Sequence, residues 1–274
     1  MLLRWLCASA ALIAAQQSWS TDFASNDGVF LVDDGAVSHC PACIYEDAKH
    51  VSFGAPGVQL RLDDVPCAAT PSACCAGGQC ARLAAGHLRS AAAQAFGTFS
   101  FVARPSFAAS GGGGSSPGAF ACLTTSYLGS PHHEVATCFV GSQPREVSLG
   151  YWSSGVPAAG IVHRVNTSFD LHAGFNNYTI EWTPTSLRLA VNGAPTASAT
   201  AAAPNTTIPW LAGQALLINR AQDGQSFSGA PAALLELRHA AYSPLTESAP
   251  AAAPAAAPAT APAARLGDEK TATD

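Results

Sequence analysis

Hydrophobic and polar residues alternate with a period of two in several segments of the chain. In residues 98–104, Phe99, Phe101 and Ala103 alternate with mostly polar neighbours, and residues 186–192 repeat this alternation. Because successive side chains of a β-strand point to opposite faces of its sheet, both segments are predicted to be half-buried strands. Clusters of Gly and Pro recur between such segments as turn signals, and the Ala-rich stretches lack a periodic apolar face. The pattern therefore predicts an all-β fold.

The turn signals and the amino-acid content divide the chain into three parts. Residues 21–247 carry the strand patterns and are long enough for one β-sandwich domain. Residues 248–274 are rich in Ala and Pro and contain too few large apolar side chains to bury a core. We therefore expect residues 248–274 to form a disordered tail.

Residues 1–20 have the pattern of a signal peptide. Arg4 precedes an apolar run over residues 5–15, and the small residues Ser18 and Ser20 stand where a signal peptidase would cut. The apolar run is shorter than the roughly 20 residues that a membrane-spanning helix needs. We expect cleavage near Ser20, no membrane span in the mature chain, and a secreted protein in the extracellular space or the cell wall.

Charged residues are scarce, which narrows the classes of partner. Asp, Glu, Lys and Arg make up 11% of the chain, and 13 basic residues against 18 acidic ones give a formal net charge of −5. This balance provides no basic surface for phosphates, so we expect no nucleic-acid partner.

Cysteine use supports export. One of the nine cysteines, Cys7, lies in the leader, and eight remain in the rest of the chain. These are Cys40, Cys43, Cys67, Cys74, Cys75, Cys80, Cys122 and Cys138. An even number in an exported chain favours disulfides over a zinc site, because no pair of histidines stands at ligand spacing. We expect neither a metal nor a cofactor.

Three Asn-x-Ser/Thr sequences are candidate sites for N-linked glycosylation. They begin at Asn166, Asn177 and Asn205, in segments that we assign to strand ends or loops. Modification at one or more of them is expected in a eukaryotic host, and it would make the protein a glycoprotein without indicating an activity.

Residues 132–141 carry the most informative pattern. The segment has the sequence His-His-Glu-Val-Ala-Thr-Cys-Phe-Val-Gly and is predicted to be one strand. Alternation places Glu134, Ala136 and Cys138 on one face, and it turns Val135 and its alternate neighbours toward the core.

This segment resembles the E-I-D-x-E-F-L-G signature of glycoside hydrolase family 16. Other blocks resemble motifs of the same family in the same order: residues 85–90 (S-G-x-I-R-S), 96–99 (Y-G-T-F), 118–126 (the strand before the catalytic one), 147–155 (N-Y-Y-x-x-G) and 169–184 (F-D and Y-x-I-E-W-T-P), with a weaker echo in 216–229. The resemblance implies a concanavalin-like jelly roll, in which two antiparallel sheets form a β-sandwich with a sugar cleft on the concave sheet.

The resemblance also assigns roles to the catalytic strand. Glu134 matches the nucleophile, Ala136 matches the helper Asp, and Cys138 matches the acid/base Glu. Hydrolysis with retention needs two carboxyl groups about 5 to 5.5 Å apart, one to attack and one to protonate the leaving oxygen. Only the nucleophile position is retained, so hydrolysis is expected to be lost or impaired.

Three interpretations of Cys138 remain open. If residues 122–138 form a hairpin centred on Ser130, Cys122 lies opposite Cys138 and the two can form a disulfide. Cys138 could instead be an inert thiol, or a reactive thiol whose pKa is lowered by His132 or His133.

Ligand-holding positions of the family are partly retained. Arg89, Tyr151 and Trp152 match positions that contact substrate, whereas His87 stands where the family has Glu and Gly150 where it has Asn. An arginine and an aromatic ring on a concave sheet can hold a sugar by hydrogen bonds and stacking. The alternative is that Arg89 pairs with a nearby carboxylate and Trp152 packs in the core.

These observations favour a secreted family 16-like protein that acts on or binds a β-glycan polysaccharide, with lost or impaired hydrolysis. One alternative is an active β-glucanase or transglycosylase whose second carboxylate is Glu146 or Glu181, and another is a structural protein of a cell wall or matrix. We expect a monomer.

Overall fold

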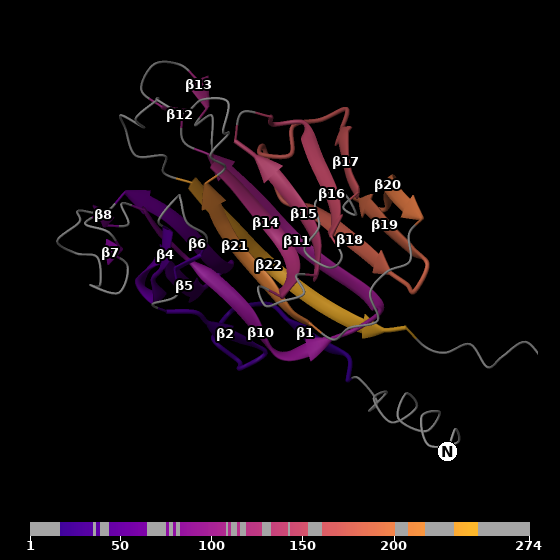
Figure 1. The fold of residues 1–274 in the computed structure, drawn as a ribbon, viewed down its shortest axis with the longest axis horizontal. Helices are drawn as coiled ribbons and strands as arrows, with labels where there is room; N and C mark the ends of the chain where they lie inside the picture. Colours follow the sequence, from indigo (N-terminus) through magenta and orange to yellow (C-terminus); the bar gives the residue numbers. More distant parts are fainter. Residues whose placement is uncertain are drawn as a thin grey trace, which may run out of the picture.

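The computed structural model describes residues 17–34, 37–38, 44–64, 75–76, 79–80, 83–107, 109–110, 114–115, 119–127, 133–141, 143–152, 161–200, 208–216 and 233–245. Within these ranges the chain forms β-strands and a single turn of 3-10 helix, η1 (Ala48–His50), and no α-helix (Figure 1). Among them, no helix has the length and hydrophobicity that crossing a bilayer would require. The all-β prediction is confirmed.

The larger sheet, called sheet A here, has eleven strands in the described part of the chain. Its order is β20 (Ala194–Thr200), β19 (Ser186–Val191), β18 (Asn176–Trp182), β11 (Gly97–Phe107), β22 (Ala233–Pro244), β6 (Gly57–Asp64), β9 (Leu83–Ala85), β4 (Ile44–Glu46) and β3 (Val37–Ser38), with β1 (Trp19–Thr21) beside β22 and β5 (Val51–Gly54) beside β6.

The second sheet, sheet B, has seven strands among the residues described. Its order is β17 (Ile161–Asn166), β16 (Glu146–Trp152), β15 (His133–Val140), β14 (Ala119–Tyr127), β21 (Ile208–Leu216), β10 (His87–Gln94) and β2 (Phe30–Val32). Two small hairpins complete the description: β7 (Cys75–Ala76) with β8 (Gln79–Cys80), and β12 (Ala109–Ser110) with β13 (Gly114–Ser115).

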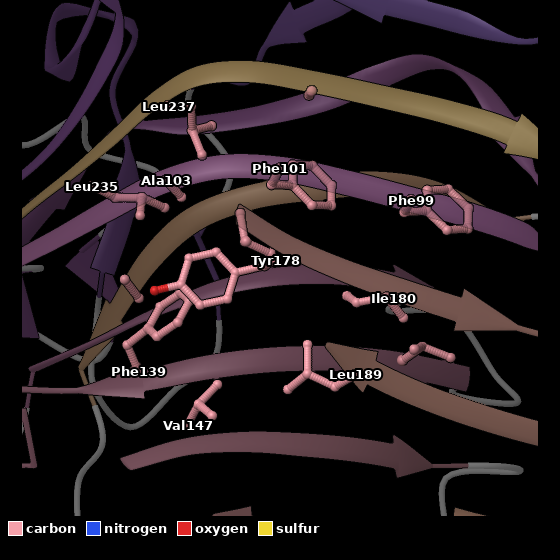
Figure 2. Close-up of a cluster of buried hydrophobic side chains, with 14 of the residues drawn as sticks. Phe99, Phe101, Ala103, Phe139, Val147, Tyr178, Ile180, Leu189, Leu235 and Leu237 are labelled. Carbon is pink, nitrogen blue, oxygen red and sulfur yellow. The ribbon is translucent and has the colours of Figure 1, made fainter. Parts of the chain in front are cut away.

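The core lies between the two sheets and is built from the alternating residues that the sequence pattern identifies. On β11, Phe99, Phe101 and Ala103 are fully buried. Figure 2 shows them in one cluster with Phe139 of sheet B and Tyr178 of sheet A, whose ring centroids lie 4.8 Å apart. Burial of these large apolar side chains supplies most of the driving force that holds the sheets together.

Strand β1 includes the last two residues of the expected leader. Trp19 and Ser20 belong to β1, where Trp19 lies opposite Tyr242 of β22 and packs edge-on against Phe30. Residues 1–16 of the expected leader and the expected tail, residues 248–274, lie outside the described residues.

Candidate functional site

Strand β15, which contains the segment that resembles the family 16 signature, lies in the interior of sheet B between β14 and β16 (Figure 1). Val135, Thr137 and Phe139 are fully buried in the core, and Cys138 is partly exposed on the opposite face, called the outer face of sheet B here. The predicted division of the strand into two faces is confirmed. Ala136 is only 1% exposed even though alternation places it on the outer face, so neighbouring groups cover its methyl group.

The register of the hairpin agrees with the one that the sequence symmetry predicts. Ser126 lies opposite Glu134, and Cys122 lies opposite Cys138. On the other side of β15, Trp152 of β16 lies opposite Glu134, and Tyr151 lies opposite Val135. The side chains of Glu134, Tyr151 and Trp152 are outside the described part of the structure, so their predicted roles stay predictions.

Cys122 and Cys138 form a disulfide across β14 and β15. Their Cα atoms are 4.2 Å apart, which matches two directly opposite residues of antiparallel strands. This selects the disulfide among the three interpretations of Cys138 and removes both thiol alternatives. A disulfide sulfur carries no ionisable proton, and therefore the position that matches the family's acid/base has no acid.

Other predicted disulfides are less completely described. Cys75 and Cys80 lie opposite each other in the β7–β8 hairpin. Cys40, Cys43, Cys67 and Cys74 lie outside the described residues, and their pairing stays a prediction.

Glu146 lies too far from Glu134 to form the pair of carboxyl groups that retention needs. It lies on β16 six residues from Trp152, the residue opposite Glu134. At about 3.3 Å per residue this is a separation of roughly 20 Å along the strand, against the 5 to 5.5 Å that retention needs. The Glu146 carboxylate instead lies 3.8 Å from Nε of Arg164 on β17.

Glu181 cannot be the second catalytic carboxylate, because it lies on the other sheet from Glu134. It lies on β18 of sheet A, where Ile180 and Trp182 point into the core and Glu181 points to solvent with half of its side chain exposed. Its nearest cationic partner is Arg188 of β19, at 3.9 Å. Nominating Glu146 or Glu181 as the second catalytic carboxylate was therefore wrong.

Arg89 lies on β10 toward the other side of sheet B, and it pairs with a carboxylate that the sequence did not identify. Its Nε donates to Oδ1 of Asp33 at 3.1 Å, and Nδ1 of His87 lies 2.9 Å from the other oxygen, Oδ2. Glu46 approaches the same ring nitrogen at 3.6 Å. Arg89 keeps 40% of its side chain exposed, so carboxylate pairing does not remove it from the surface.

The two carboxylates of this cluster have pKa values displaced in opposite directions. Burial alone would raise the pKa of Asp33, but the hydrogen bonds and positive charges of His87 and Arg89 outweigh burial and lower it. Burial raises the pKa of Glu46; His87 opposes this shift, and the negative charge of Asp33 adds to it. The cluster thus holds an anionic Asp33 beside a Glu46 whose negative charge is poorly stabilised.

Two predicted glycosylation sites lie at the surface. Asn166 ends β17 and Asn177 lies on β18, and both are exposed. Asn205 lies outside the described residues. Exposure makes Asn166 and Asn177 accessible, and their modification stays a prediction.

Comparisons with known families and solved structures show what this chain is similar to. The sequence profile described as "Glycosyl hydrolases family 16" matches residues 42–223. A search of curated protein sequences finds no significant match.

Solved structures share the fold at low sequence identity. The β-glucanase of Bacillus licheniformis matches with a TM-score of 0.66 and 19% identity, covering 84% of this chain and 99% of the glucanase. The catalytic domain of an endo-1,3-β-glucanase (laminarinase) from Thermotoga petrophila RKU-1 matches with a TM-score of 0.63 and 11% identity, covering 83% and 97%. The Crh5 transglycosylase matches with a TM-score of 0.58 and 15% identity, covering 85% and 86%. The predicted concanavalin-like jelly roll is confirmed.

Proposed function

The chain belongs to glycosyl hydrolases family 16, and from this membership we propose that it binds a β-glycan on the outer face of sheet B without hydrolysing it. The family resemblance assigns the catalytic strand to β15 of sheet B, and the register sets Trp152 of β16 opposite Glu134, which supports a glycan site on this sheet. Function follows from the site rather than from the fold, and the proposal rests on Arg89, Tyr151 and Trp152, which match ligand-holding positions of the family, while Cys138 stands at the position that matches its acid/base.

The Cys122–Cys138 disulfide is the observation that carries this proposal. It occupies the position that matches the acid/base residue and leaves no titrating group there. General acid catalysis contributes about 10²- to 10⁴-fold to such reactions. Neither Glu146 nor Glu181 lies where it could replace this acid, so Glu134 would act as a hydrogen-bond acceptor for sugar hydroxyls.

Arg89 is the described side chain best suited to hold a sugar. Asp33 fixes the guanidinium through Nε while the side chain stays partly exposed, so its remaining N–H groups can donate to hydroxyls. Structures with this fold are described as a β-1,3-1,4-glucanase (lichenase) and an endo-1,3-β-glucanase (laminarinase). Lichenan and laminarin are therefore the first glycans to test.

The disulfide also supports the proposal that the protein is exported. Disulfides form and persist in oxidising compartments and are rare in the cytosol. A secreted glycan-binding protein would meet its polysaccharide in the extracellular space or the cell wall.

A paired binding and hydrolysis assay tests the proposal. The purified chain is titrated with lichenan, laminarin, xyloglucan and κ-carrageenan while reducing ends are counted. We expect retention on at least one glycan without release of reducing ends. Arg89→Ala and Trp152→Ala should weaken binding, whereas Arg188→Ala, which removes an exposed arginine of sheet A, should not. Hydrolysis by the wild type that Glu134→Gln abolishes would overturn the proposal.

A further inference from the structure

We propose that Asp33, Glu46 and His87 form a binding site for a divalent metal ion of the zinc type. One potential ligand atom from each residue lies within 4.8 Å of the other two. Asp33 directly follows β2, Glu46 ends β4 and His87 begins β10. Sheet B thus contributes two ligands and sheet A contributes the third, so a bound ion would link the two sheets at this edge.

The distances around His87 suit a shared ion. Its Nδ1 lies 2.9 Å from Oδ2 of Asp33 and 3.6 Å from Oε1 of Glu46. Two ligands at about 2.1 Å from a tetrahedral zinc ion stand about 3.4 Å apart. The three ligand atoms lie within 4.8 Å of one another, so an ion that replaces the imidazole proton would draw the Asp33 and Glu46 carboxylates closer together.

The burial of the Glu46 carboxylate distinguishes this cluster from an ordinary ion pair. The Glu46 side chain is only 8% exposed, and it makes no hydrogen bond with the described residues. The single proton on Nδ1 of His87 points to the nearer oxygen, that of Asp33, and 3.6 Å is too long for a hydrogen bond to Glu46. Buried carboxylates are normally hydrogen-bonded, paired or coordinated to metals. A cation between Glu46 and Asp33 would satisfy both carboxylates.

The backbone around the cluster is held in place before any ion binds. The amide of Asp33 donates to the carbonyl of His87 at 3.2 Å, and the amide of Asp47 donates to the carbonyl of Ala85 at 3.1 Å. Between β9 and β10, the amide of Gly86 donates to the carbonyl of Arg61 at 2.7 Å. A β-carbon at Gly86 would lie 2.4 Å from the carbonyl oxygen of His50, so only glycine allows this close crossing. The three ligands are therefore presented on a fixed frame.

The ligand types select the kind of ion. Calcium and magnesium prefer oxygen ligands alone, whereas one imidazole with two carboxylates suits zinc and similar transition metals. Arg89 would keep its bond to Oδ1 of Asp33 while Oδ2 faces the ion, so the ion would also orient Arg89.

Zinc titration of the full chain tests the proposal. After treatment with EDTA and its removal, Zn²⁺ binding is measured by calorimetry, and unfolding temperatures are measured in EDTA and in excess ZnCl₂. We expect one site whose zinc affinity falls about tenfold or more in Glu46→Gln and in His87→Ala. Zinc should raise the unfolding temperature of the wild type by several degrees and leave that of Glu46→Gln unchanged. Calcium and magnesium should have no such effect.

Matched controls separate this site from zinc bound elsewhere. Glu181→Gln and His163→Ala remove an exposed carboxylate and an exposed imidazole outside the cluster and should bind zinc as the wild type does. In EDTA, Glu46→Gln should unfold at the same temperature as the wild type or higher, because it removes a buried charge. Equal zinc affinity in the wild type and Glu46→Gln would overturn the proposal, as would stabilisation by calcium alone.

Discussion

Cys122 and Cys138 restrain the unfolded chain through their disulfide. Their disulfide closes a loop with a sequence separation of 16 residues. A loop of this length lowers the entropy of the unfolded chain by an amount worth about 3 kcal/mol. We expect the double variant Cys122→Ala/Cys138→Ala to lose about that much free energy of unfolding, measured by urea denaturation. A loss below about 1 kcal/mol would contradict the pairing as a stabilising feature.

The same variant separates stability from function at this position. In the proposal the disulfide does not contact the glycan; it only leaves the site without an acid. The glycan affinity of the folded double variant should therefore change little. Reduction of the wild type with a mild thiol reagent should reproduce the stability loss. Hydrolysis that appears on reduction would instead indicate that the Cys138 thiol can act as an acid.

His172 gives a second prediction at the scale of a single residue. Its ring packs against Phe107 with centroids 4.9 Å apart, and its Nε2 is buried without a hydrogen-bond partner among the described residues. Burial lowers the pKa of His172 below its usual 6.5, and the nearby Asp170 only partly opposes this. Below pH 6.5 His172 is protonated in the unfolded chain but stays largely neutral in the folded chain. The free energy of unfolding that the neutral His172 contributes at pH 7 is therefore lost as the pH falls.

Urea unfolding of the wild type and of His172→Gln at pH 7.5 and pH 5.5 tests whether His172 causes this loss of stability at low pH. Glutamine does not titrate, so the variant should lose less free energy of unfolding between the two pH values than the wild type does. An equal loss in both proteins would assign the acid sensitivity to other groups. The substitution His163→Gln, at an exposed histidine of β17, serves as the matched control for replacing an imidazole by an amide.

At the scale of elements, strand β1 tests where the folded domain begins. Trp19 lies opposite Tyr242, and its ring packs 5.3 Å from that of Phe30. Removing a partly buried tryptophan costs about 2 kcal/mol. A chain that begins at Thr21 should therefore unfold at a lower temperature than one that begins at Gln17. Equal unfolding temperatures would mean that β1 adds nothing to stability. N-terminal sequencing of the protein after expression would test the predicted cleavage near Ser20.

Local patterns within one hairpin were sufficient to predict its register. The symmetry of residues 122–138 placed Cys122 opposite Cys138, because a hairpin pairs residues equidistant from its turn. Alternation likewise predicted which side chains of β15 and β11 enter the core. Contacts inside such elements depend on neighbours in sequence, and the sequence contains that information directly.

Contacts between distant strands were not predictable in the same way. Glu181 alternates correctly on its strand, but alternation does not tell which sheet the strand joins, and β18 joins sheet A. Asp33 lies 54 residues from His87, and Glu46 reaches the same cluster from the other sheet. No spacing rule connects such residues, so this cluster could be found only after the strands had been placed.

At the scale of the whole molecule, the positions proposed to bind a glycan lie on strands of the sandwich rather than on loops. Sheet B is supported from behind by the core, where Phe139 packs against Tyr178 of sheet A (Figure 2). Strand-borne positions change little on binding, because the strands are fixed by their ladders and by the core. A glycan would therefore meet a site that is already formed, and its binding energy would add to the stability of the folded domain.

Glycan binding should accordingly be visible in the unfolding of the entire domain. A ligand present at 100 times its dissociation constant stabilises the folded state by about 2.7 kcal/mol, which for a domain of this size is about 5 to 10 °C. We expect oligosaccharides of the preferred β-glycan to raise the unfolding temperature by that amount, without new reducing ends after prolonged incubation. Arg89→Ala should abolish the shift, and Arg188→Ala should retain it, because Arg188 lies on β19 of the opposite sheet. An equal shift in both variants would place the glycan away from β10 and would require another binding face.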